Sequence, residues 1–78
     1  MPEPVILASS RKHGVSDGDI LHALGFAVRI WKQDDGLTMI VGPKQDGLLI
    51  EVGAVIREDR TVTIVHALEP ARRKFLGW

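Results

Sequence analysis

The sequence contains no cysteine, and only four of its 78 residues are aromatic. Without cysteine there are no disulfides, no thiolate metal sites and no cysteine nucleophiles, and this composition is typical of a reducing compartment. Four aromatic side chains do not predict a platform on which bases stack. No apolar run approaches the roughly 18 residues of a membrane-spanning helix, and Met1-Pro2-Glu3-Pro4 lacks the basic region of a signal peptide. We therefore expect a soluble, cytoplasmic protein.

An excess of charge of either sign is also missing, because 10 lysines and arginines balance 10 aspartates and glutamates. A neutral chain is not drawn to nucleic acid by its overall charge. The cations are nevertheless grouped, in Arg11-Lys12-His13 and in Arg72-Arg73-Lys74. If folding brings these two groups together, the neutral protein carries one basic face.

The composition is otherwise that of a globular protein, with 45% hydrophobic and 26% charged residues. We expect one domain over residues 1–78, which is so short that it buries only about 60–65% of its unfolded surface.

The first 25 residues predict two short helices. Val5 to His13 forms the first, which ends at Gly14 as a left-handed residue, although Val5-Ile6-Leu7 is equally compatible with a short edge strand. Ser16 is the expected N-cap of the second helix, which stops at Gly25.

From residue 27 onward the hydrophobic period changes to the alternation of strands, separated by turns rich in Asp and Gly. The expected strands are Ala27–Lys32, Leu37–Val41, Leu48–Ile56 and Val62–Leu68. A turn of helix or an extended tail follows at Ala71–Leu76. The predicted fold class is therefore α+β, with two short N-terminal helices, a four-stranded antiparallel meander and a short C-terminal helical tail.

Alternation also assigns the side chains of the two long strands to faces. On the third strand, Ile50, Val52, Ala54 and Ile56 are expected on one face, and Leu49, Glu51, Gly53 and Val55 on the other. On the last strand, Val62, Ile64, His66 and Leu68 are expected to share a face.

Few residues have the chemistry of a catalytic or metal site. The spacing of His13, His22 and His66 does not match a zinc site, so we predict no metal and no other cofactor. Glu51 interrupts an apolar strand, but it can simply face solvent beside a cross-strand partner such as Thr63. As a general base it would need a pocket and a perturbed pKa.

The two basic groups allow a functional and a structural interpretation. Arg11 to Gly14 is explained by the capping of a helix C-terminus, where cations offset the helix dipole. His66 followed by Arg72-Arg73-Lys74 suits proton transfer beside cations that stabilise a phosphorane-like charge. The alternative for the second group is a hydrogen-bonded core histidine followed by a solvated basic tail.

Several of these motifs, taken in order, resemble a known family. Lys12-His13-Gly14-Val15, a helix with Ala23, an Asp-Asp-Gly turn, and Ile64-Val65-His66-Ala67 before a basic tail are similar to the BrnT-like toxins. These are small members of the RelE-like group of type II toxin–antitoxin systems. The resemblance covers about residues 10 to 76. It implies a RelE/BrnT-like α+β domain with a curved antiparallel sheet, an endoribonuclease activity against mRNA, and neutralisation by a cognate antitoxin.

The chain departs from this family at two places. The last strand of the family ends in Ile-Ser-Ala-Arg, whereas Val65-His66-Ala67-Leu68 stands here, so that Leu68 replaces an arginine implicated in the active site. The Gly-Glu-x-Arg of the family is replaced by Gly36-Leu37-Thr38-Met39.

RNA cleavage without a metal needs a base, an acid and cations around the phosphate. The predicted catalytic residues are Lys12, His13, His66, Arg72 and Arg73, and the predicted RNA-binding residues are Arg11 and Lys74.

Two other functions remain compatible with the sequence. One is a non-catalytic domain that binds a protein partner through Trp31, Phe75 and Trp78. The other, a DNA-binding regulator, lacks a recognisable recognition helix. The edge strands of a small sheet also invite pairing, so a homodimer or a sheet extended by the antitoxin is compatible with this sequence.

Overall fold

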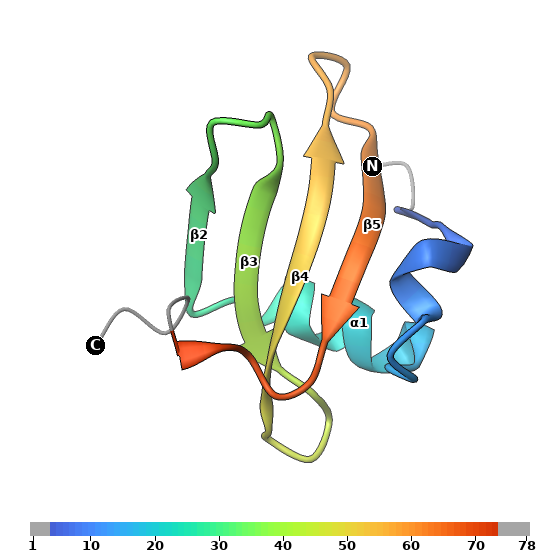
Figure 1. The fold of residues 1–78 in the computed structure, drawn as a ribbon, viewed down its shortest axis with the longest axis vertical. Helices are drawn as coiled ribbons and strands as arrows, with labels where there is room; N and C mark the ends of the chain where they lie inside the picture. Colours follow the sequence, from blue (N-terminus) through green and yellow to red (C-terminus); the bar gives the residue numbers. More distant parts are fainter. Residues whose placement is uncertain (1–3, 74–78) are drawn as a thin grey trace.

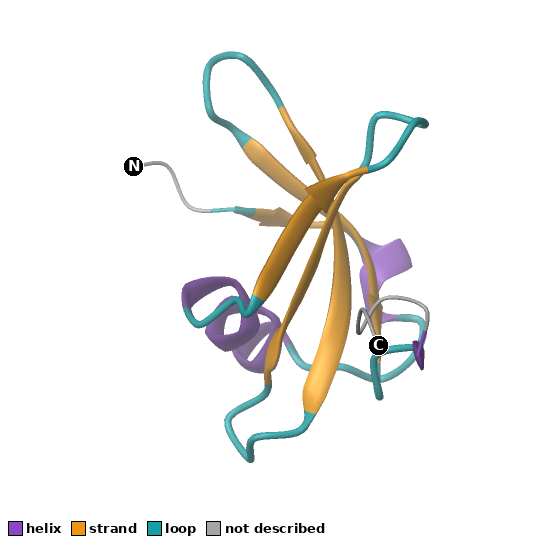
Figure 2. Cartoon of the chain, turned by 90° about the vertical axis from the view of Figure 1, so that its left-hand side faces the viewer, coloured by secondary structure: helices purple, strands orange, loops and turns teal. Residues whose placement is uncertain are grey.

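The computed structural model describes residues 4–73, which form a five-stranded sheet with one α-helix packed on one face (Figures 1 and 2). The elements are β1 (Val5–Ile6), the 3₁₀ helix η1 (Ala8–Arg11), α1 (Asp17–Gly25), β2 (Arg29–Lys32), β3 (Thr38–Pro43), β4 (Leu49–Ile56) and β5 (Val62–Leu68). The strand order is β1-β5-β4-β3-β2, in which β1 is parallel to β5 and all other pairs are antiparallel. No helix among these residues is long and apolar enough to cross a membrane.

The predicted fold of two helices and a four-stranded antiparallel meander is wrong, because the first predicted helix is not formed. Val5 and Ile6 instead pair with Thr63 and Ile64 of β5, which makes the sheet five-stranded and mixed. Both residues are β-branched and therefore favour a strand. The short edge strand left open at Val5-Ile6-Leu7 is close to what is observed.

Hydrogen bonds of the next segment also take the place of those that an α-helix would form. The Ser10 hydroxyl donates to the Leu7 carbonyl at 2.6 Å, and the Leu7 N–H donates to the Ile64 carbonyl at 3.0 Å. Such local and cross-chain bonds satisfy backbone groups that a continuous helix would otherwise use.

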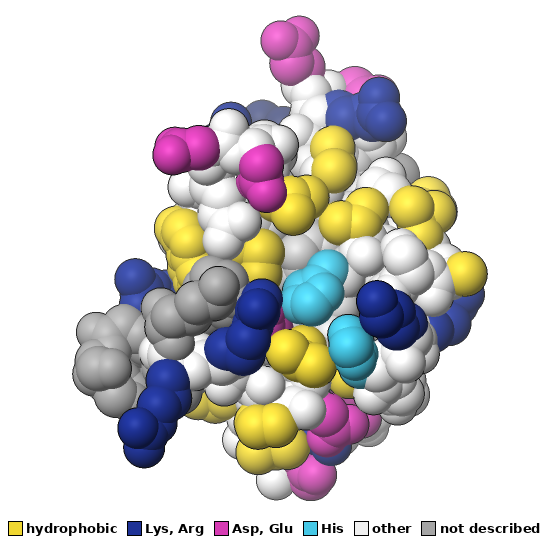
Figure 3. Space-filling model, in the orientation of Figure 1, with side chains coloured by type: hydrophobic (Ala, Val, Ile, Leu, Met, Phe, Trp, Pro, Cys, Tyr) yellow, Lys and Arg dark blue, Asp and Glu magenta, His cyan; other side chains and the backbone are white. Residues whose placement is uncertain are grey.

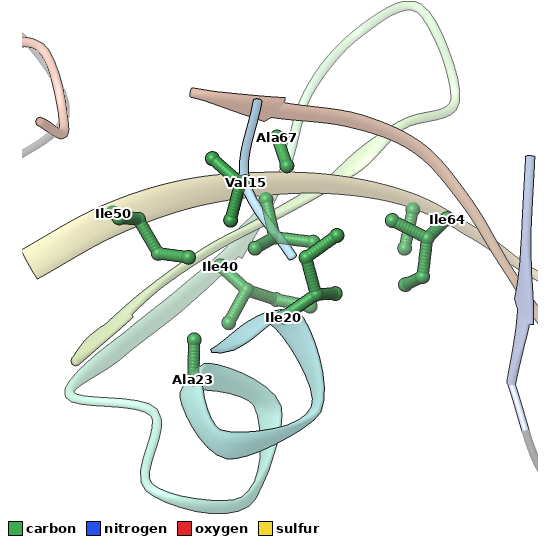
Figure 4. Packing of buried hydrophobic residues seen from close by; sticks show 9 residues of the cluster. Val15, Ile20, Ala23, Ile40, Ile50, Ile64 and Ala67 are labelled. Atoms are coloured by element: carbon green, nitrogen blue, oxygen red, sulfur yellow. The ribbon is translucent and has the colours of Figure 1, made fainter. Parts of the chain in front are cut away.

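The helix α1 forms where the sequence predicts it. The Ser16 side chain accepts a hydrogen bond from the Asp19 N–H at 3.2 Å, as an N-cap does. Ile20 and Ala23 are fully buried against the sheet, and Figure 4 shows them directed toward Ile40 and Ile50. At Gly42 an added Cβ would clash with the Ala23 carbonyl, so α1 and β3 pack with their backbones in direct contact.

A β-bulge in β5 decides which side chains reach the other face of the sheet. Gly53 lies opposite His66, but the next residue, Ala54, lies opposite Ile64, so Val65 is an extra residue in β5. Ile64 therefore points into the core under α1, whereas His66 points to the opposite face, which we call the open face. The predicted shared face for Val62, Ile64, His66 and Leu68 is wrong for this reason.

The described part of the C-terminal segment crosses the open face, where Figure 1 shows it in front of the sheet. The Ala71 N–H donates to the Leu49 carbonyl at 2.9 Å, and Ala71 packs with Met39 and Val41. Residues 74–76 of the predicted helical tail lie outside the described residues, as do Phe75 and Trp78.

Candidate functional site

Glu51 lies at the centre of the open face with a side chain that is 0% exposed. Its neighbours across the sheet are Val41 on β3 and Leu68 on β5. The expectation of a solvent-facing carboxylate beside Thr63 is wrong, because Thr63 lies opposite Val55. The sequence marks Glu51 as a charge in an apolar row, but it does not show what covers the charge.

Arg72 and His66 satisfy the buried carboxylate. The backbone N–H of Arg72 donates to Oε1 at 2.8 Å, and its guanidinium donates through Nε at 3.0 Å to Oε1 and through Nη2 at 2.8 Å to Oε2. Nε2 of His66 lies 3.0 Å from Oε2. Charge-assisted and bidentate bonds of this kind are the strongest hydrogen bonds in proteins.

Two opposing effects determine the protonation state of Glu51. Burial raises the pKa of its carboxyl group, but hydrogen bonds from the Arg72 side chain, the Arg72 backbone and His66 together outweigh burial. The pKa of Glu51 is therefore lowered from its usual value of 4.5. The site thus holds a carboxylate at neutral pH.

This carboxylate determines the tautomer of His66. A carboxylate only accepts hydrogen bonds, so Nε2 of His66 carries a proton, and in the neutral ring Nδ1 is a proton acceptor. The side chain of His66 is 30% exposed, so the ring is both oriented and accessible. Gly53 makes room for it, because a Cβ there would lie 3.2 Å from the His66 Cβ.

His13 completes the central cluster. Its ring centroid is 6.1 Å from that of His66, with an edge-to-face angle of 78°. The preceding segment holds it there, because the Ser9 hydroxyl donates to the carbonyl of the bulged Val65 at 2.9 Å. Figure 3 shows two histidine side chains together on the open face, with lysine or arginine side chains on both sides. We call Glu51, His66, Arg72 and His13 the histidine–carboxylate cluster.

The structure distributes the other predicted site residues differently. Arg11 donates two hydrogen bonds, of 2.9 and 2.8 Å, to the carboxylate of Asp17. Asp17 lies in the first turn of α1, where an acidic side chain is favoured. Lys12 and Arg73 are exposed and have no ion pair with another described residue. Lys74 lies outside the described residues.

The third histidine does not join the cluster. Nδ1 of His22 bonds to the Pro43 carbonyl at 2.8 Å, and its ring packs on Phe26. Among residues 4–73, no group of three or more potential ligands could hold a metal ion.

The chain matches no family model, no curated protein and no solved structure. The chemical case for the site consequently depends on its own geometry. That geometry unites three of the five predicted catalytic residues, His13, His66 and Arg72, around Glu51, which was not among them.

Proposed function

We propose that this protein is a metal-independent endoribonuclease that cleaves mRNA, the toxin of a type II toxin–antitoxin pair, held inactive by a cognate antitoxin. The observation that carries this proposal is the accessible histidine pair, in which His66 is oriented by a buried carboxylate. A base oriented by a third group is the arrangement that activates hydroxyl nucleophiles in unrelated enzymes.

The chemistry requires only groups that the open face provides. Nδ1 of His66 takes the proton from a 2′-hydroxyl, whose oxygen then attacks the adjacent phosphorus. The P–O5′ bond breaks, and protonated His13 gives its proton to the departing 5′-oxygen. The products are a 2′,3′-cyclic phosphate and a 5′-hydroxyl, so protons and charge balance without a redox partner.

Cations near the cluster suit the negative charge that develops on the phosphate oxygens. Arg72 is half-exposed while it bonds Glu51. Lys12 precedes His13 in the sequence and Arg73 follows His66, and both of these cationic residues are exposed. Leu68 stands where the BrnT-like toxins carry an arginine. Because Leu68 lies opposite Glu51, the Arg72 guanidinium brings a positive charge to the same region of the sheet.

Expression in a bacterial host tests the toxin proposal. We expect the wild-type chain to arrest growth and fragment mRNA, and co-expression of the neighbouring gene product to restore growth. His66→Gln should abolish both effects. His22→Gln is the matched control, because His22 lies outside the cluster, and it should remain toxic. Normal growth with intact mRNA at high wild-type expression would refute the proposal.

The second candidate is a non-catalytic domain that binds a protein partner. It is favoured by the bond network itself, since Glu51 also anchors the C-terminal segment across the open face through the Arg72 backbone. In that case His66→Gln and His13→Gln leave every phenotype unchanged, while changes at Trp31 abolish partner binding. The two candidates therefore predict opposite responses to the histidine variants.

A further inference from the structure

The most exposed large apolar side chains of the described residues gather at one edge of the sheet. Phe26, Val28 and Ile30 are 62%, 65% and 62% exposed, and they lie within five residues at and before β2. Single exposed apolar residues are ordinary, but three within five residues favour an interaction surface.

The same edge offers backbone hydrogen-bonding groups. Within the described residues β2 pairs only with β3. The register is regular from Arg29 onward and continues with a bond from the Gln33 N–H to the Leu37 carbonyl at 2.8 Å, whereas just before β2 the Val28 N–H also turns toward β3 and donates to the Val41 carbonyl at 2.8 Å. Hydrogen-bonded residues alternate along an antiparallel ladder. Ile30 and Lys32 therefore direct their backbone N–H and C=O groups away from β3, toward the edge.

We infer that β2 pairs antiparallel with β2 of a second copy of this chain, with the two Ile30 residues opposite each other at the twofold axis. The outward N–H and C=O groups of each Ile30 then bond to those of its counterpart. A twofold interface must be complementary to itself, and this register meets that requirement.

The side chains that this register brings together favour a second copy of the chain as the partner of β2. Arg29 faces Trp31 of the second copy, and within one chain the Arg29 guanidinium already lies 4.7 Å from the Trp31 ring centroid. No like charges are directly opposite, which would destabilise the pair. The formal net charge of zero adds no overall repulsion between copies.

The dimer would contain one continuous ten-stranded sheet. A twofold axis perpendicular to the sheet keeps equivalent faces on the same side, so both open faces point the same way. His66 is on β5, which β3 and β4 separate from β2, so dimerisation leaves the histidine–carboxylate cluster accessible. The inference is thus independent of the proposed ribonuclease activity.

The molar mass of the protein, measured by light scattering as it elutes from a size-exclusion column, tests the inference directly. We expect the wild-type chain to have twice the 8.6 kDa mass of one chain and the Ile30→Lys variant to have half the wild-type mass. Ile30→Pro is a second variant, because it removes only an outward-facing N–H and leaves the β3 ladder intact. It should also be monomeric, with an unchanged far-UV circular dichroism spectrum.

The opposite edge of the sheet provides the matched control. Val5 is 57% exposed on the other edge strand, β1, and Val5→Lys should remain dimeric. A wild-type chain that is monomeric at millimolar concentration overturns the inference. A dimer that persists in folded Ile30→Lys and Ile30→Pro, or that dissociates in Val5→Lys, also overturns it.

Discussion

Glu51 orients His66 and anchors the C-terminal segment through one buried carboxylate. Its carboxylate is buried, and it accepts hydrogen bonds from Arg72 and His66 on the open face of the sheet. A buried charge without partners is strongly destabilising, and a pair usually costs about 3–5 kcal/mol when one member is removed. Here the half-exposed Arg72 can regain water, so the loss should be smaller.

Glu51→Gln should therefore lower the free energy of unfolding by about 2 kcal/mol at pH 7, as measured by urea denaturation. Its pH dependence has a definite sign. Because the pKa of Glu51 is lowered in the folded state, its stabilisation is complete above 4.5, the usual value, and is lost as the pH falls through the lower folded value. The variant should therefore lose less stability on acidification than the wild type.

Glu58→Gln is the control for this measurement, because Glu58 is exposed in the turn before β5. It should behave like the wild type at neutral and acidic pH. If Glu51→Gln and the wild type lose the same stability between pH 6 and pH 3, values that span the titration of a carboxyl group, the assigned role of Glu51 is wrong.

At the scale of the elements, the β5 bulge and η1 act together to position the two histidines. The bulge turns His66 onto the open face, and the bulged Val65 carbonyl accepts the Ser9 hydroxyl at 2.9 Å. The segment that carries this bond also leads to His13. The placement of His13 beside His66 thus depends on how firmly η1 is held to β5.

Ser9→Ala should consequently reduce RNA cleavage about tenfold while costing only about 1 kcal/mol of stability, since it removes one exposed hydrogen bond. Ser9→Thr keeps the hydroxyl and should restore most of the rate. A loss of folding stability alone would not separate Ser9→Ala from Ser9→Thr so sharply. The initial rate of cleavage of a single-stranded RNA gives the measurement. Equal rates for Ser9→Ala and the wild type would show that the Ser9–Val65 hydrogen bond does not position the site.

At the scale of the whole molecule, local patterns predicted the parts of the fold that depend on nearby residues. The α1 helix follows from its Ser16 cap and apolar face, and the positions of β2 to β5 follow from alternation and from turns that end in Gly36 and Gly47, both with positive φ. The parallel β1–β5 pair could not be predicted in this way, because Val5 and Thr63 are far apart in the sequence.

The candidate site was predictable only in part for a similar reason. Residue type singled out His13, His66 and Arg72, but alternation placed His66 on the wrong face because a one-residue bulge leaves no clear mark in an apolar strand. Arg72, one of the two partners of Glu51, lies 21 residues later in the sequence, beyond the end of β5. Only the folded chain shows that these two groups meet.

End-group analysis of RNA treated with purified protein in the presence of a chelator shows whether the histidine–carboxylate cluster cleaves RNA without a metal. We expect fragments with 2′,3′-cyclic phosphate and 5′-hydroxyl ends from the wild type and from His22→Gln. His66→Gln and His13→Gln should produce at least a hundredfold fewer fragments, in line with the usual contribution of a general acid or base. Cleavage that is unchanged in folded His66→Gln, or the absence of any cleavage by the wild type, would show that the cluster is not a ribonuclease site.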